Sequence, residues 1–158
     1  MKRKLRGIGI VLLLYIAGSC AKEPVANETL ETGKNYTSIE QEVMRIVNEH
    51  RASLNLNTLQ FNKIAYEYAN IHTKYMISKG EINHDHFNAR ASKMSKKVSA
   101  KKISENVAKN FKTAKDAFEE WMSSELHKIT IEENFNYTAV SVKKDSDGHY
   151  YFTQIFFR

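Results

Sequence analysis

The C-terminal residues of the chain carry the pattern that most limits its fold: a strand, a turn and a second strand. Residues 137–144 place two valines on one face, residues 145–148 hold Asp and Gly, and residues 149–157 are rich in aromatic side chains. Such runs on either side of an Asp/Gly turn are typical of an antiparallel hairpin. We therefore predict a sheet, which a short strand at residues 103–108 would complete.

The residues before this hairpin follow helical spacing. Ser38 and Gln41 predict a capping box that opens a first helix, which runs to about Leu54. Asn62 predicts the cap of a second helix, and Gly80 ends it.

The middle of the chain gives weaker signals. Residues 81–102 are expected to be irregular, with a short helix near residues 87–94. Thr113 and Asp116 predict a capping box for a fourth helix, which closes at His127. Helices first and an antiparallel hairpin last predict the α+β class, with helices packed on the sheet.

The first 19 residues predict a secretory signal. Four basic residues precede an apolar run over residues 7–17, which is too short to span a bilayer because a span needs about 20 apolar residues. Small residues at 17–19 then precede Cys20, the one cysteine of the chain. This order resembles the bacterial lipobox, in which the cysteine receives a diacylglycerol. An ordinary secretory signal with an incidental cysteine is the alternative.

The segment after the signal predicts a tether. Residues 20–37 contain the one proline and few large apolar side chains, so we expect a flexible spacer between a lipidated Cys20 and a domain at residues 38–158. Acyl chains on Cys20 would hold the protein on a membrane of the bacterial cell envelope, facing outside the cytoplasm. The membrane is therefore an expected partner.

The charge balance argues against nucleic acid as a partner. The chain has a net charge of +6, but removing residues 1–19 leaves 20 basic and 18 acidic side chains. A secreted address makes nucleic acid less favoured still. Residues 93–102 contain five lysines, which could touch phosphate head groups or an acidic polymer. A solvated loop is the alternative interpretation.

Several short motifs along the domain carry side chains suited to binding or catalysis. They are Asn48-Glu49-His50-Arg51, His84-Asp85-His86 with Arg90 downstream, Ser104-Glu105-Asn106-Val107-Ala108, and Trp121-Met122-Ser123-Ser124-Glu125-Leu126-His127. In this order and spacing they resemble the bacterial branch of the CAP superfamily: cysteine-rich secretory proteins, antigen 5 and pathogenesis-related 1 proteins, also called the SCP domain. The resemblance implies a three-layer α-β-α sandwich.

The resemblance also implies a surface cleft lined by two histidines and two acids. On this basis His84 is the first histidine, Glu105 the first acid and His127 the second histidine. Ser124 stands where many relatives carry the second acid, and the adjacent Glu125 could substitute. Neutral imidazoles with carboxylates can hold a divalent cation such as zinc, or a polar ligand. The metal ligands would then be His84 and His127.

Three functions stay open at this point. The first is a lipid-anchored envelope protein that binds a ligand or a divalent cation in this cleft. The second is a protease-like hydrolase that uses Glu105 together with His84 or His127, since a histidine paired with a glutamate can serve as a general base. The third is a structural envelope protein with a vestigial cleft. No nucleophile with an adjacent base stands out, so the sequence assigns no catalytic residue.

Overall fold

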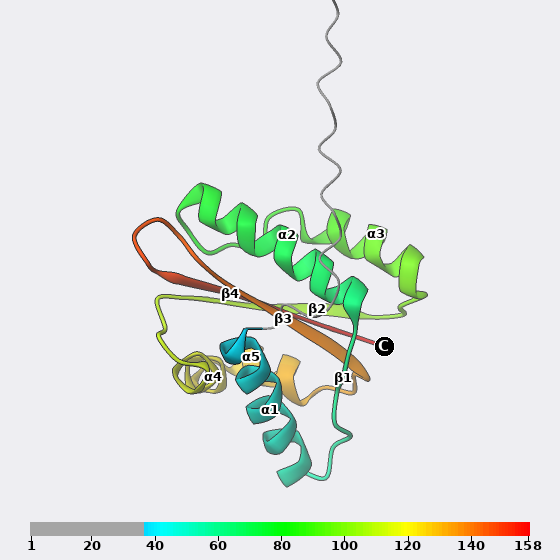
Figure 1. Ribbon diagram of the computed structural model, residues 1–158. Helices are drawn as coiled ribbons and strands as arrows, with labels where there is room; N and C mark the ends of the chain where they lie inside the picture. The colour runs from blue at the N-terminus through cyan, green and yellow to red at the C-terminus, as the bar shows by residue number, and fades with distance from the viewer. Residues whose placement is uncertain (1–36) are drawn as a thin grey trace, which may run out of the picture.

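Figure 1 presents the chain as a computed structural model that describes residues 37–158. The predicted signal peptide, Cys20 and nearly all of the tether lie outside the described residues. The helices and strands, in chain order, are α1 (Ser38–Ser53), β1 (Gln60–Phe61), α2 (Lys63–Lys79), α3 (Phe87–Val98), β2 (Ile103–Lys109), α4 (Ala114–Ser123), α5 (Glu125–Glu132), β3 (Tyr137–Lys144) and β4 (Tyr150–Phe157). None of these helices is long and apolar enough to cross a membrane.

The strands form one sheet in the order β1-β3-β4-β2. Helices α2 and α3 cover one face, and α1, α4 and α5 cover the other (Figure 1). The α+β class and the three-layer α-β-α sandwich are therefore confirmed. The predicted hairpin is the antiparallel β3–β4 pair, and β2 pairs antiparallel with the other side of β4. The sequence analysis missed β1, which has two residues and runs parallel to β3.

Each face of the sheet has its own hydrophobic cluster. Successive residues of β3 point to opposite faces, so Val140 and Val142 pack against α1 and α4, whereas Ala139 packs against α2. On the α4 side, Trp121 is completely buried and its indole N–H donates to the Val107 carbonyl at 3.0 Å. Both clusters are formed by residues within 37–158, and a fragment that begins at Ala21 contains all of these residues.

The N-cap of the first helix lies one residue earlier than predicted. Thr37, not Ser38, is the N-cap, and its partner in the capping box is Glu40, not Gln41. The Glu40 carboxylate accepts the Thr37 N–H at 2.8 Å and also the Val142 N–H at 2.7 Å, which ties α1 to β3. The bond to Val142 accounts for the choice of Glu40 over Gln41 as the partner in the capping box, because the Glu40 side chain is buried and Gln41 is exposed.

The second helix begins and ends as predicted. The Asn62 side chain accepts the Ala65 N–H, and Gly80 lies in the left-handed region with φ +72°, where glycine is favoured.

Two predictions about the middle of the chain were wrong in extent. Helix α3 continues to Val98, because Met94 and Val98 pack on the α2 layer. The fourth helix does not reach His127: it ends at Ser123, the backbone of Ser124 is extended, and α5 begins at Glu125. The predicted cap at Thr113 is confirmed, since its hydroxyl accepts the Asp116 N–H.

The motif at the end of α1 serves the fold. Arg51 is completely buried, and its guanidinium donates to the carbonyls of Asn57, Ile131 and Glu133 at 2.7–2.9 Å. Burial lowers the pKa of Arg51 from its usual value. The Asn48 amide both donates to and accepts from the Leu59 backbone. These side chains fasten the loop after α1 and the end of α5 to the helix.

Replacing Arg51 with Met should strongly destabilise the domain. The buried carbonyls would lose their donors, and each unsatisfied group costs about 1–3 kcal/mol, so we expect a loss of about 3 kcal/mol or more in the free energy of unfolding. Urea denaturation measures it. Arg45→Met is the matched control, because the exposed Arg45 pairs with Glu42 and Glu49 on the surface of α1. Equal effects of the two substitutions would contradict the role of Arg51.

Candidate functional site

The candidate site lies where segments from three parts of the chain meet at strand β2. Side chains alternate along this strand: Glu105 contacts His84 and His72 on the α2 side, whereas the Asn106 amide donates to the His127 carbonyl at 3.1 Å on the α5 side. At the end of β2, the Lys109 ammonium donates to the Gly80 carbonyl of the α2–α3 loop. Of the predicted residues, Glu105 thus lies on β2, and His84 and His127 both contact this strand.

Glu105 is the best-partnered group of the site. Its side chain is 1% exposed, its two oxygens accept from one Arg90 nitrogen at 2.8 and 2.7 Å, and Oε1 lies 2.9 Å from His84 Nδ1. Burial raises the pKa of Glu105, but the His84 hydrogen bond and the charges of His72 and Arg90 lower it by more. The carboxyl pKa therefore lies below its ordinary value, and Glu105 is ionised at neutral pH.

His72 and Arg90 belong to this cluster, although the sequence did not assign them to the cleft. His72 on α2 is completely buried, with Nε2 2.7 Å from the Asn83 carbonyl and 3.5 Å from Glu105 Oε1. A carbonyl only accepts, so Nε2 carries the proton, and the buried Nδ1 has no hydrogen-bond partner among residues 37–158. Burial lowers the pKa of His72, and the Glu105 charge opposes this in part.

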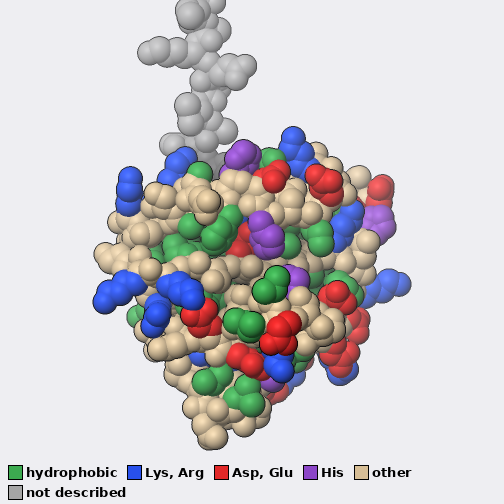
Figure 2. Space-filling view, turned by 180° about the vertical axis from the view of Figure 1, so that it is seen from behind, with side chains coloured by type: hydrophobic (Ala, Val, Ile, Leu, Met, Phe, Trp, Pro, Cys, Tyr) green, Lys and Arg blue, Asp and Glu red, His purple; other side chains and the backbone are tan. Residues whose placement is uncertain are grey.

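The two predicted histidines differ in exposure. The His84 side chain is 50% exposed and uses Nδ1 for Glu105, which leaves Nε2 for another partner. His127, near the start of α5, is partly buried, and its buried Nδ1 has no hydrogen bond to any residue that the structure describes. Burial lowers the pKa of His127, and the charge of nearby His84 lowers it further. Figure 2 shows histidines beside acidic and hydrophobic side chains near the centre of one face of the molecule.

The second acid of the cleft remains a prediction. Glu125 is exposed at the first position of α5. In the part of the chain that the structure describes, no hydrogen bond or ion pair joins it to His84, Glu105 or His127. Glu120, at the end of α4, lies close enough for its charge to raise the pKa of His127. The break at Ser124, which the sequence did not predict, determines how these two helices place their acids.

The predicted metal ligands in this cleft are the imidazoles of His84 and His127. Among residues 37–158, one set of three potential ligands lies within 4.8 Å of one another, and it is Asp145, Asp147 and His149 in the β3–β4 turn, not the cleft. The Asp145 carboxylate already accepts the backbone N–H groups of Asp147 and His149, which stabilises the turn. In the cleft, Glu105 is committed to Arg90 and His84.

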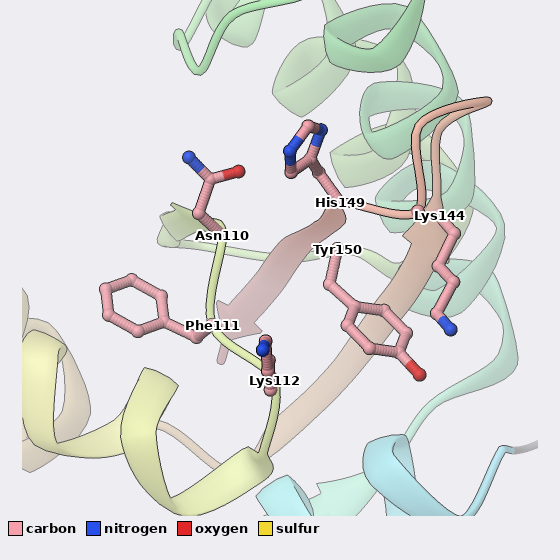
Figure 3. A pocket seen from close by; sticks show the side chains of 7 residues that line it. Asn110, Phe111, Lys112, Lys144, His149 and Tyr150 are labelled. Carbon is pink, nitrogen blue, oxygen red and sulfur yellow. The ribbon is translucent and has the colours of Figure 1, made fainter.

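A cavity of about 250 Å³ lies beside this turn, away from the predicted site. Figure 3 shows its lining side chains, which come from the loop after β2 and from the ends of β3 and β4: Asn110, Phe111, Lys112, Lys144, His149 and Tyr150. None of the predicted cleft residues lines it.

Solved bacterial structures have the same fold. An outer surface protein from Borrelia burgdorferi aligns with a TM-score of 0.68 and 19% identity, over 75% of this chain and 90% of that chain. A cysteine-rich secretory protein from Staphylococcus aureus gives 0.67 and 20%, over 80% and 40%. An extracellular protein containing an SCP domain from Bacillus anthracis gives 0.64 and 26%, over 75% and 40%. The layered arrangement is thus that of SCP-domain proteins.

The chain belongs to the cysteine-rich secretory protein (CAP) family, which it matches over residues 44–156. The family resemblance drawn from the motifs is therefore confirmed. No curated protein matches the chain. The matched region includes His84, Glu105 and His127, whose roles stay predictions.

The domain should lose stability as the pH falls from about 7.5 to about 5. His72 and His127 have lowered pKa values, so the unfolded chain binds protons below the ordinary histidine pKa of about 6.5 that the folded chain does not bind. Glu105 adds to this loss at lower pH. Because its pKa is lowered in the folded state, it stabilises the fold above the ordinary carboxyl pKa, and this stabilisation is lost as the pH falls further. Urea denaturation across this pH range measures the slope.

The His72→Gln variant separates the contribution of His72. Glutamine keeps an N–H donor for the Asn83 carbonyl but does not titrate. In this variant the free energy of unfolding should therefore fall less steeply between about pH 7.5 and about pH 5, the range in which histidine titrates. An unchanged slope in this variant would contradict the assignment.

Proposed function

We propose that this domain is a binding module of the bacterial cell envelope, which holds a polar ligand or a divalent cation between the imidazoles of His84 and His127. The arrangement of Glu105 carries the proposal. Its buried carboxylate accepts from His84 Nδ1 and thereby orients a ring that is half exposed. The lowered pKa of His127 keeps the second imidazole neutral at pH 7, and a neutral imidazole is the form that binds metals or accepts hydrogen bonds.

The same geometry argues against Glu105 itself as the general base of a hydrolase. A general base needs a free lone pair and a pKa near the working pH. Arg90 and His84 engage the Glu105 carboxylate, and its pKa is shifted down instead of up. This arrangement suits a group that positions its neighbours.

A divalent cation such as zinc fits the cleft in part. His84 and His127 offer two nitrogen ligands, while the structure gives no third protein ligand close to both. Among the described residues, the Nδ1 atom of His127 has no hydrogen-bond partner, so it is available to a cation or to a bound ligand. Water or oxygen atoms of a bound ligand would fill the remaining positions, and the cation would supply positive charge for an anionic group.

Calorimetry with zinc tests this proposal on the fragment that begins at Ala21. We expect His84→Ala and His127→Ala each to weaken binding at least tenfold, by roughly 1.4 kcal/mol or more. His149→Ala is the control, since it removes the other candidate cluster and should leave cleft binding intact. Heat that is lost only in His149→Ala would place the metal at the turn and contradict the cleft proposal.

The proposal includes a lipid anchor on Cys20 and a location outside the cytoplasm. Support comes from the lipobox-like order before Cys20 and from relatives described as an outer surface protein and an extracellular protein. Those names describe the relatives, and they are the reason to test a location outside the cytoplasm for this chain.

The Cys20→Ser variant should move the protein from the detergent phase to the aqueous phase in a partitioning assay of the full chain. Without the thiol there is no acyl chain to hold the protein on the membrane. Globomycin, which blocks lipoprotein processing, should arrest wild-type maturation. No other cysteine is present in the chain to accept a lipid. Detergent partitioning that survives the substitution would overturn the anchor.

A further inference from the structure

The outer side of α3 carries lysines with no acidic counterparts. From residue 87 to residue 104 the chain has six basic side chains and no Asp or Glu. Two of the six are used within the fold, since Arg90 pairs with Glu105 and Lys102 pairs with Glu133. The remaining four, here named the lysine face, are exposed and have no ion pair within residues 37–158: Lys93, Lys96, Lys97 and Lys101.

Three of the four residues of the lysine face belong to helix α3. Lys93, Lys96 and Lys97 are spaced at i, i+3 and i+4, which places their side chains together on one side of α3. Met94 is completely buried and holds the helix on the α2 layer, and the Lys97 ammonium lies 5.5 Å from the centre of the Tyr68 ring. Like charges at this spacing repel one another, so the free domain gains from a negative partner at this surface.

Positive and negative charge are distributed unevenly over the domain. Residues 114–133, which form α4 and α5 on the other face of the sheet, contain six acidic and two basic side chains. The domain is therefore basic on the α3 side and acidic on the α4–α5 side, although its overall charge is small. Figure 2 shows basic side chains on the side of α3 and acidic side chains gathered toward α4 and α5. Such a distribution orients a protein in the field of a charged surface.

We propose that the lysine face docks the domain onto an anionic phospholipid bilayer. Lysines are compact charges on flexible stems, which suit the diffuse negative potential of a lipid surface. Tyr68, the ring that Lys97 contacts, is buried and so is closed to stacking by nucleic-acid bases.

The predicted anchor would bring the bilayer within reach. Sixteen residues separate Cys20 from Thr37, and an extended chain spans at most about 3.6 Å per residue, so lipidation would keep the domain within roughly 60 Å of the membrane. This argument about reach rests on the proposed lipid anchor, whereas the charge argument does not.

Vesicle binding tests the proposal with the unlipidated fragment that begins at Ala21. We expect it to sediment with vesicles of phosphatidylcholine mixed with phosphatidylglycerol, but not with phosphatidylcholine alone. Binding should weaken as salt rises from about 0.1 M to about 1 M, because the Debye length falls from about 10 Å to about 3 Å. The triple variant Lys93→Glu, Lys96→Glu, Lys97→Glu should bind at least tenfold more weakly.

A matched triple variant controls for net charge. Lys112→Glu, Lys115→Glu and Lys144→Glu change the charge equally, but these residues lie near α4 and the hairpin. This variant should keep affinity within about twofold of wild type. Thermal unfolding verifies that both variants fold, and zinc binding in the cleft should survive the α3 substitutions, which separates this proposal from the proposed function.

Three outcomes would overturn the docking proposal. One is equal binding to neutral and anionic vesicles, or binding to neither. Another is an equal loss in the two triple variants. The third is binding to soluble polyphosphate without binding to anionic vesicles, which would assign the lysine face to an anionic polymer.

Discussion

A buried carboxylate at the edge of the sheet is the constraint on which the site depends. Glu105 is ionised yet nearly inaccessible to water, and such a group is tolerated only when it is paired and hydrogen-bonded. Its partners come from α2, from the α2–α3 loop and from α3: His72, His84 and Arg90. Helix α3 itself has one completely buried residue, Met94. The ion pair of Arg90 with Glu105 therefore adds to the packing of Met94 in attaching this helix, and the contact of Glu105 with His84 orients the half-exposed ring.

The strongest local patterns in the sequence were enough to predict the fold class. The β3–β4 hairpin, the cap at Asn62 and the end at Gly80 all depend on neighbouring residues, and all agree with the structure. The features that were missed depend on distant partners. Strand β1 exists because Gln60 and Phe61 pair with Tyr137 and Thr138. The cap of α1 lies at Thr37 and not at the predicted Ser38, and its partner Glu40 also contacts the Val142 backbone, about a hundred residues away.

The site shows the same division between local and distant information. His84 and Glu105 stand in recognisable motifs, and the structure brings them into contact. His72 fits the apolar stripe of α2, and its main partner is the backbone carbonyl of Asn83, which has no sequence signature. The α1 motif illustrates the opposite case: Asn48 and Arg51 match the family pattern, but they bind backbone groups within the fold. A motif therefore identifies residues that matter to the fold or to the site, and only contacts distinguish the two.

Helix α3 connects the two surfaces proposed to bind partners. Arg90 and Lys97 are seven residues apart, which is about two turns, so they lie on similar sides of the helix and roughly 10 Å apart along its axis. Arg90 is fixed by Glu105 at the cleft, and Lys97 belongs to the lysine face. Because one rigid helix carries both, a bilayer that contacts the lysine face would lie near the cleft. The pairing of Arg90 with Glu105 would then set the orientation of the cleft relative to the membrane.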